Sequence, residues 1–258
     1  MEKRLRFNED EANYDKYRPL YPTELFDDII RYSGVDLRSR LIEIGIGTGQ
    51  ATSRFLELGC EVTGVELGDR LAAFVREKYK MYPNFKVINE DFLSYASRDC
   101  EKECDLIYSA TAFHWLPEPE CYEALKHLIR RGGTVALFWN HPFTCREGDE
   151  SNAASNEVYK ALRPSDKKQI EFSEQDTHQR ITALKNAGFT DIECHLYKRV
   201  RRLCCEEYIG LLNTYSDHRS LPAEVKDEFE RRMIAAINSV GGFISIYDTL
   251  DLYLARLP

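Results

Sequence analysis

The chain has 258 residues, of which 43% are hydrophobic, and Lys+Arg 35 against Asp+Glu 43 give a formal net charge of -8. This length suits one large domain, or a domain with a cap, that buries a sizeable core. The acidic balance disfavours a general binder of nucleic-acid backbones, because such proteins normally carry an excess of basic residues. Residues 1–6 lack the apolar stretch of a signal peptide, and no segment approaches the roughly 18 apolar residues of a membrane span. We therefore expect a cytoplasmic protein with no membrane partner.

The cysteine pattern argues against both disulfides and a metal site. There are 8 cysteines and no secretory context that would oxidise them. The pair Cys100-x-x-x-Cys104 and the adjacent Cys204 and Cys205 lack a second cysteine or histidine pair at zinc spacing. We predict reduced thiols and no bound metal.

The first clear helix covers residues 23–32, with Leu25, Phe26 and Ile29 on one face and Gly34 as its end. Residues 7–22, which precede it, are polar and rich in tyrosine, and they show no amphipathic period. This segment is predicted to be either a surface arm or a lid over a site, since loops next to strand ends often carry function.

An apolar strand at residues 41–44 runs into a loop with glycine at every second position. The loop contains Gly45, Gly47 and Gly49, and a helix with its apolar positions at helical spacing follows. Glycines in a strand-loop-helix unit let the backbone approach a ligand above the strand end, although a tight turn alone would also use them. The dinucleotide fingerprint would require a third glycine at position 50, which is Gln50.

Three more strands end in acidic or aromatic residues that could contact a ligand. Residues 61–65 lead into Glu66, about 20 residues beyond Gly45, where a carboxylate can accept hydrogen bonds from ribose hydroxyls. Residues 85–89 lead into Asp91 and Phe92, and residues 104–109 lead into Ala110 and then Phe113-His114-Trp115. Because parallel strands bring such ends to one edge of a sheet, we expect these residues to share a site.

Strands and helices alternate through the remaining core. Helices are predicted at residues 69–80 and 119–131, followed by a strand at residues 133–139. Residues 140–172 read as an insertion near the site, with a helix at residues 151–162, before a helix at 174–187 and a strand at 192–200. Two helices, at residues 206–215 and 222–241, precede a last strand at 243–254. The alternation predicts a largely parallel sheet with helices on both faces.

The glycine loop with its preceding acid, Glu43-x-Gly45-x-Gly47-x-Gly49, resembles motif I of the class I S-adenosylmethionine (SAM)-dependent methyltransferases. The stretch Phe113-His114-Trp115 after the fourth strand is similar to motif IV of their small-molecule branch, the type 11 or trans-aconitate methyltransferase-like proteins. The resemblance implies a Rossmann-like, seven-stranded, mostly parallel α/β sheet whose last strand is antiparallel. It also implies one methyltransferase domain over residues 1–258, with a lid at 1–24, a SAM-binding core at 25–200 and 243–258, and a helical cap at 201–242.

The resemblance also implies which residues hold the cofactor, SAM, which leaves as S-adenosylhomocysteine (SAH). Expected cofactor contacts are Tyr14, Arg18, Glu43, Gly45, Gly47, Thr48, Gly49, Gln50, Glu66, Leu67, Asp91, Phe92, Ala110 and His114. Expected substrate contacts are Trp115, Trp139, Tyr215, His218 and Arg219, each of which would have a packing or solvent role otherwise.

Methyl transfer is an in-line displacement, so the protein mainly aligns the reactants and excludes water. His114 is the candidate general base, with packing against adenosine as its alternative, and Arg219 is the candidate partner of an anionic acceptor. We expect transfer to an oxygen of a small molecule, either a carboxylate or a hydroxyl.

Three alternatives stay open: an RNA methyltransferase, a NAD-dependent oxidoreductase, and a non-catalytic SAM-binding protein. Only the basic run at residues 198–202 supports RNA, and a solvated strand end also explains that run. DNA is not an expected partner, since the motif that methyltransferases of base amino groups carry after the fourth strand is missing.

Overall fold

The computed structural model describes residues 10–98, 104–165 and 168–258. Its seven-stranded sheet has the order β3-β2-β1-β4-β5-β7-β6. The first five strands pair in parallel, and β7 is antiparallel to both of its neighbours. The strands are β1 (Arg40–Ile44), β2 (Glu61–Glu66), β3 (Phe85–Asn89), β4 (Cys104–Ala110), β5 (Ile129–Phe143), β6 (Thr190–Cys204) and β7 (Phe243–Arg256). The predicted Rossmann-like sheet with an antiparallel last strand is confirmed.

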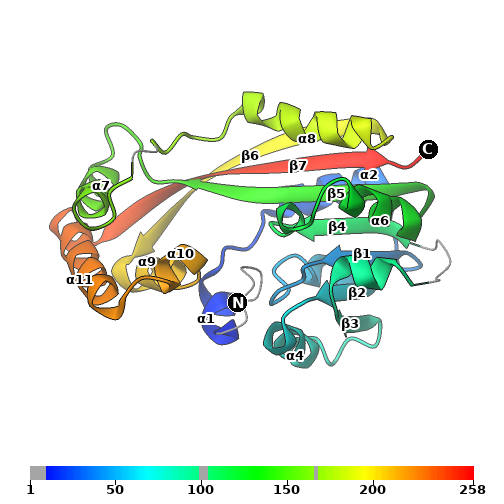
Figure 1. Ribbon diagram of the computed structural model, residues 1–258, viewed down its shortest axis with the longest axis horizontal. Coiled ribbons are helices and arrows are strands. Elements are labelled where there is room, and N and C mark those ends of the chain that lie inside the picture. The colour runs from blue at the N-terminus through cyan, green and yellow to red at the C-terminus, as the bar shows by residue number, and fades with distance from the viewer. Residues whose placement is uncertain (1–9, 99–103, 166–167) are drawn as a thin grey trace.

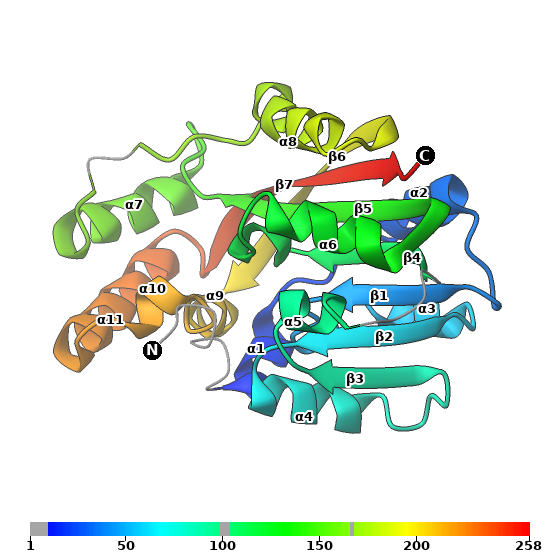
Figure 2. The same cartoon turned by 45° about the vertical axis from the view of Figure 1, so that its right-hand side comes forward.

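Helices cover both faces of the sheet. One face carries α2 (Thr23–Ser33), α3 (Ser53–Glu57) and α4 (Asp69–Lys78), and the other carries α5 (Phe92–Ala96), α6 (Glu120–Leu128) and α8 (Glu174–Asn186). In α2 the residues Leu25, Phe26 and Ile29 are buried against the sheet, and Gly34 ends the helix in a left-handed conformation. Figure 2 shows β1, β2 and β3 side by side, with their arrowheads directed toward the same end of the molecule.

At that end, β5, β6 and β7 extend beyond the core and carry a separate group of helices (Figure 1). We call this group the cap; it comprises α7 (Glu150–Leu162), α9 (Cys205–Leu212), α10 (Ser216–Arg219) and α11 (Ala223–Ser239). These helices share a buried cluster that includes Val158 and Phe229. The cap thus takes in α7, from the stretch that we read as an insertion, because Val158 packs with α9 and α11.

The predicted ends of these three strands were wrong. Strand β5 continues to Phe143, which pairs with Tyr247, and β6 continues to Cys204, which pairs with Phe243. The predicted helix at 119–131 ends earlier, at Leu128, where β5 begins. Ladder pairing across the three-stranded ribbon, which a local apolar pattern does not reveal, sustains these long strands.

Residues 7–22 were predicted to form a surface arm or a lid, and they show no amphipathic period; α1 (Glu11–Tyr17) lies within them. The Asp10 side chain caps its start by accepting a hydrogen bond from the Asn13 backbone N–H at 3.2 Å. No residue of α1 is fully buried, and so its sequence lacks the apolar stripe that marks a helix packed on a core.

Two arginines of the basic run at residues 198–202 are engaged inside the protein, while Lys198 and Arg202 are exposed. Arg199 and Arg201 both bind the carboxylate of Asp248, which is buried, at 2.9 and 2.5 Å. Arg202 lies over the Phe243 ring at 5.0 Å. Side chains alternate along a strand, so Arg199 and Arg201 lie on the same face of β6. The run was predicted to be either an RNA contact or a solvated strand end, and with these two arginines paired it is not wholly solvated.

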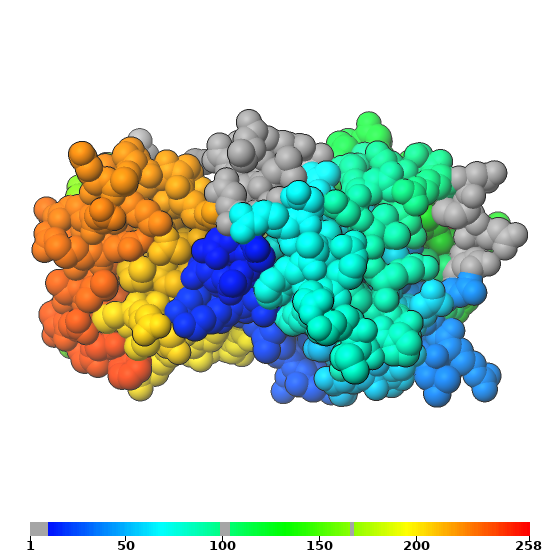
Figure 3. Space-filling model, turned by 90° about the horizontal axis from the view of Figure 1, so that it is seen from below, coloured from blue at the N-terminus to red at the C-terminus, as the bar shows by residue number. Residues whose placement is uncertain are grey.

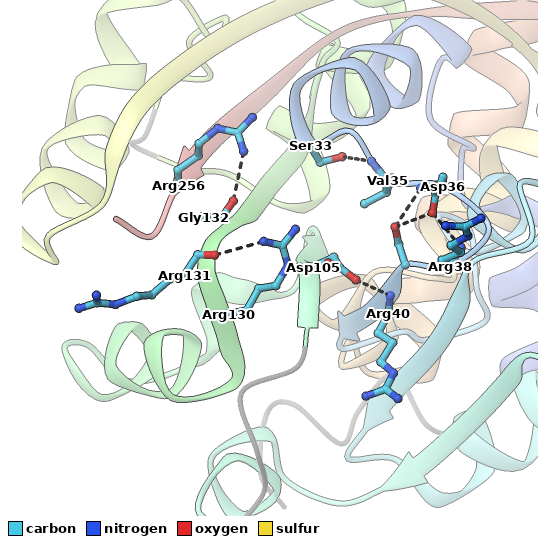
Figure 4. A network of polar contacts seen from close by, with 11 residues as sticks. Ser33, Val35, Asp36, Arg38, Arg40, Asp105, Arg130, Arg131, Gly132 and Arg256 are labelled. Atoms are coloured by element: carbon cyan, nitrogen blue, oxygen red, sulfur yellow. Dashed lines mark hydrogen bonds and ion pairs between the residues drawn. The ribbon is translucent and has the colours of Figure 1, made fainter.

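Polar contacts tie the strands together at the edge of the sheet opposite the cap (Figure 4). The Asp105 carboxylate accepts hydrogen bonds from the Arg40 backbone N–H at 2.8 Å and from Arg130 Nε at 2.6 Å. Arg256 Nη1 donates to the Gly132 carbonyl at 3.2 Å. These contacts join the starts of β1, β4 and β5 to the end of β7, away from the predicted site residues.

Within the described ranges, no helix is long and apolar enough to cross a membrane. The same residues contain no group of three or more His, Cys, Asp or Glu side chains that could hold a metal ion. Seven cysteines are described, and all are free thiols; Cys100 lies outside the described residues.

Candidate functional site

A cavity of about 320 Å³ lies at the carboxyl ends of β1, β2 and β4, where the sheet meets the cap. We call it the main cavity. The strand order reverses between β1 and β4, and ligands bind at such switch points in open α/β sheets. Most of the predicted cofactor residues line it: Tyr14, Arg18, Gly45, Gly47, Glu66, Leu67, Asp91, Phe92, Ala110 and His114.

The glycine loop passes close over the end of β1. Gly45 has a φ of +65°, and a Cβ there would lie 2.5 Å from the Ala112 Cβ, so only glycine fits. Gly49 serves the fold instead, because its carbonyl accepts a hydrogen bond from the Tyr79 hydroxyl at 2.8 Å. Thr48 is fully buried. Thr48 and Gly49 were both predicted cofactor contacts. In the structure they face the protein interior and do not line a cavity at the site.

Glu66 is held by the backbone on both of its carboxylate oxygens. Oε2 accepts from the Gly47 N–H at 2.9 Å, and Oε1 accepts from the Gly68 N–H at 2.8 Å. Burial raises the pKa of this carboxyl, while these backbone hydrogen bonds act in the opposite direction. Glu66 therefore fixes the loop and presents its remaining lone pairs to the main cavity.

A second cavity of about 180 Å³ adjoins the first and is lined by Glu43, Gln50, Arg18 and Asn140, among others. Oε2 of Glu43 accepts from the Thr52 hydroxyl at 2.6 Å and from the Tyr108 hydroxyl at 2.8 Å. Burial raises the pKa of Glu43 to about 7, although both hydrogen bonds favour the ionised form. The charge of this group can therefore change near neutral pH.

His114 is oriented by Trp139, whose Nε1–H donates to His114 Nδ1 at 2.9 Å. Desolvation and the nearby Arg180 guanidinium lower the pKa of His114, which favours the neutral ring. With Nδ1 accepting, the proton of the neutral ring sits on Nε2. His114 lines the main cavity, but Trp139 lies behind it and does not contact either cavity among the described residues.

The predicted substrate residues Trp115, Tyr215, His218 and Arg219 separate into two groups. Trp115 and Tyr215 line the main cavity. His218 was expected to meet an anion or to lie in an exposed turn, but it is fully buried, and its Nε2 lies 3.1 Å from Glu230 Oε1. Arg219 is partly exposed and is not among the described residues that line the main cavity. The short helix α10 causes this split, since it turns His218 inward.

The sequence reasoning missed several lining residues, among them Thr111, Asn140 and Asp217. Thr111 follows β4 with a φ of +55°, a strained conformation for a β-branched residue that is typical of functional loops. Asn140 and Asp217 come from the extension of β5 and from α10. The Thr111 conformation leaves no mark in the sequence, and the other two depend on how the cap folds back over the sheet.

Helix α1 closes the cleft between the core and the cap (Figure 3). Toward the cap, Asn13 Nδ2 donates to the Gly210 carbonyl at 3.2 Å, and Arg18 Nη2 donates to the Thr214 carbonyl at 3.0 Å. Toward the core, Asp15 binds Lys78 at 2.6 Å. These contacts hold Tyr14 and Arg18 in the cavity wall, as a lid would.

The comparisons with known proteins agree on one kind of domain. The family model described as a methyltransferase domain matches residues 41–133, which contain the glycine loop and the strand ends of the main cavity. An uncharacterized methyltransferase of Schizosaccharomyces pombe is 23% identical over 239 residues, covering 91% of this chain and 88% of that protein. The chain is a class I SAM-dependent methyltransferase. This assignment leaves the NAD-dependent alternative without support.

Two solved structures share the fold of this methyltransferase. A type II methyltransferase candidate from Anaeromyxobacter dehalogenans gives a TM-score of 0.66 at 19% identity and covers 93% of this chain and 98% of that chain. A phosphoethanolamine N-methyltransferase of Haemonchus contortus, solved with SAM, gives 0.57 at 15% identity and covers 100% and 60%. None of these comparisons singles out the trans-aconitate subtype, which stays a prediction.

The site of the methyltransferase fits a cofactor with both kinds of charge. SAM carries a sulfonium, an ammonium and a carboxylate. Glu43 and Glu66 place two carboxylates beside the glycine loop, while Arg18 Nε is buried without a hydrogen-bond partner among the described residues. An orphaned guanidinium N–H next to a cavity is costly unless a ligand satisfies it. The Arg18 N–H suits the carboxylate of the cofactor, the Glu43 carboxylate suits its cationic groups, and the Glu66 carboxylate suits hydroxyl donors.

The docking of α1 on the cap makes a testable prediction for Gly210. A Cβ at this position would lie 2.5 Å from the Tyr17 ring. Gly210→Val should therefore displace α1 from α9 without harming α9, since valine is a better helix former than glycine. Because Tyr14 and Arg18 move with α1, we expect SAM affinity, measured by calorimetry, to fall roughly tenfold.

Tyr17→Ala in the Gly210→Val background supplies the control, because it removes the ring that the valine strikes. The double variant should bind SAM more tightly than Gly210→Val alone. Equal affinity of wild type and Gly210→Val would show that docked α1 does not contribute to cofactor binding.

Proposed function

We propose that this methyltransferase transfers the methyl group of SAM to an oxygen of a small molecule, a carboxylate or a hydroxyl. The observation that carries the proposal is the enclosure of the site, with α1 bridging the core and the cap over the cavity wall. A site covered in this way excludes water and favours an acceptor small enough to be surrounded.

In this proposal the carboxylate of Glu66 receives the ribose hydroxyls of the cofactor. Asp91 receives the adenine amino group, and Phe92 packs on the adenine ring. All three residues line the main cavity. Arg18 and Glu43 take the methionine end of the cofactor, since both line the second cavity.

The reaction needs little covalent chemistry from the protein. A lone pair of the acceptor oxygen attacks the methyl carbon while the carbon–sulfur bond breaks, and its electrons remain on sulfur to give SAH. A carboxylate acceptor has no proton to lose, whereas a hydroxyl releases its proton to solvent. Alignment and exclusion of water are then the main contributions of the enzyme.

The geometry favours His114 as a hydrogen-bond donor over the general base that its position first suggested. Nδ1 is occupied by the Trp139 N–H, so Nε2 carries the proton in the neutral ring. A base must have a free lone pair, and neither nitrogen offers one in this state.

RNA is a weaker candidate acceptor, because Arg199 and Arg201 of the basic run are held by Asp248 and the net charge is -8. The absence of a DNA partner and a cytoplasmic location stay predictions from the sequence.

The test of the proposed function is SAH release in a panel of carboxylic acids, phenols, alcohols, amines, thiols and short RNAs. The amine arm matters because one protein of the same fold is a phosphoethanolamine N-methyltransferase. We expect turnover with an oxygen acceptor. Release of SAH with amines, thiols or RNA alone would overturn the proposal.

A matched pair of substitutions separates the two functions of His114. In His114→Gln the amide nitrogen can replace the Nε2–H donor, so we expect kcat within a few fold of wild type. His114→Asn keeps a group near Nδ1 but loses that donor, and kcat should fall about tenfold. If His114 were a base, both variants would lose 10²- to 10⁴-fold. The measurement is kcat for SAH release with the best acceptor in the panel.

A further inference from the structure

A third cavity, of about 350 Å³, lies inside the cap. We call it the cap cavity. Tyr215 lines it and also lines both the main and the second cavity, and Pro142 and Asp217 are each shared with one of them. The three spaces therefore adjoin one another around Tyr215, which places an occupant of the cap cavity next to the cofactor site.

The walls of the cap cavity are mostly aromatic and apolar. Tyr159, Tyr208, Leu211, Leu212 and Ile246 line it together with Tyr215. The hydroxyls of Tyr159 and Tyr208 lie 3.4 Å apart and bond to each other. These side chains thus offer ring faces and methyl groups to an occupant, and they favour a flat apolar body.

The charges around the cap cavity disfavour a cationic occupant. Arg163 and Asp217, which both line the cavity, form an ion pair at 2.7 Å and offset each other. Two of the tyrosine rings are already matched to arginines, with Arg18 at 4.6 Å from the Tyr215 centroid and Arg163 at 5.8 Å from that of Tyr159. An ammonium ligand would compete with these guanidinium groups and be repelled by them.

One polar atom in this lining lacks a partner. The His218 side chain is fully buried, and its Nδ1 has no hydrogen-bond partner among the described residues. Nε2 lies 3.1 Å from Glu230 Oε1, so in the neutral ring Nε2–H donates to the carboxylate and Nδ1 is an acceptor. Burial lowers the pKa of His218 despite Glu230, which favours that neutral ring.

A buried acceptor that goes unpaired is destabilising, and a ligand that donates a hydrogen bond would recover part of that cost. A carboxylate cannot do so, because two acceptors would face each other. A neutral hydroxyl can. The cap cavity therefore combines mostly apolar walls with one hydrogen-bond acceptor that can bind an O–H group.

We propose that the cap cavity binds the methyl acceptor, and that the acceptor is a neutral aromatic molecule with a hydroxyl that donates to Nδ1 of His218. Its other end meets the cofactor at Tyr215. This inference rests on the proposed function and adds to it that the acceptor is an aromatic compound with a neutral hydroxyl at the end away from the cofactor.

The test uses two probes of equal shape on SAH-saturated enzyme, p-cresol and p-xylene, of which only p-cresol donates a hydrogen bond. His218→Gln can keep a donor to Glu230 but loses the acceptor at Nδ1, while His218→Asn keeps an acceptor near Nδ1. We expect the ratio of the two dissociation constants to shift against p-cresol by roughly threefold to tenfold in His218→Gln and to stay near wild type in His218→Asn.

Leu212→Trp gives a second route that does not depend on the histidine. The larger side chain should fill the cap cavity and abolish binding of both probes, while SAH affinity and the melting temperature report that the enzyme is folded.

An unchanged ratio of the two dissociation constants in His218→Gln would overturn the inference. Preferred binding of p-toluate, or loss of p-cresol binding when SAH is added, would also overturn it. These results leave oxygen methylation intact, since that proposal fails only in the SAH-release panel.

Discussion

Glu66→Gln should weaken SAM binding by about 3 kcal/mol, more than a hundredfold in the dissociation constant. Both carboxylate oxygens of Glu66 accept backbone N–H groups, at 2.9 Å from Gly47 and 2.8 Å from Gly68. A glutamine can satisfy only one of them, because its amide nitrogen must then point a donor at the other N–H. The substitution therefore disturbs the glycine loop and removes the charge that receives the ribose hydroxyls.

Glu61→Gln is the matched control, since Glu61 opens the same strand and undergoes the same chemical change. Its side chain is 47% exposed and pairs with Lys86 at 3.4 Å, and such surface pairs contribute little. Calorimetry should find wild-type SAM affinity in Glu61→Gln. Wild-type SAM affinity in Glu66→Gln would show that Glu66 does not bind the cofactor.

The grouping of Gly45, Glu66 and Asp91 in one cavity could be predicted from the sequence because it depends on short-range features. Each of these residues lies at or just after the end of a strand of five or six residues, and parallel pairing brings such ends together whatever the rest of the chain does. The largely parallel sheet was predicted from the alternation of strands and helices, and its antiparallel last strand was implied by the family resemblance alone.

The rest of the site depends on contacts between distant segments, and local patterns do not report them. Helix α1 has no apolar stripe because it bridges two bodies through polar contacts such as Asn13 with Gly210. His218 looks like part of a charged turn, yet it is buried by Phe229 of α11, with ring centroids 5.3 Å apart. Thr48 and Gly49 fit the motif, but Tyr79, about 30 residues along the chain, decides that Gly49 supports the loop.

Glu43→Gln should flatten the pH dependence of stability between pH 4.5 and 7. Burial raises the pKa of Glu43 from its ordinary 4.5 to about 7, so in this window the folded protein holds a proton that the unfolded chain releases. The stabilisation is complete below pH 4.5 and is lost as the pH rises through 7, about 3 kcal/mol in all. A glutamine oxygen can still accept from Thr52 and Tyr108. Denaturant titrations of both proteins from pH 4 to 8 measure the difference, and parallel stability curves would contradict the assignment.

The same carboxyl should make SAM binding depend on pH in the opposite direction. SAM brings a sulfonium and an ammonium to a site whose second cavity is lined by Glu43. The ionised carboxylate attracts these cations and the protonated acid does not, so SAM affinity should rise on the order of tenfold between pH 6 and 8, with proton release on binding. Glu43→Gln should bind SAM with the weaker affinity at both pH values. Glu66 is also a buried acid with a raised pKa. If the pH dependence of SAM affinity persists in Glu43→Gln, Glu66 is the group whose change of charge causes it. Calorimetry in two buffers of different ionisation enthalpy counts the protons released and thereby decides which carboxyl changes charge.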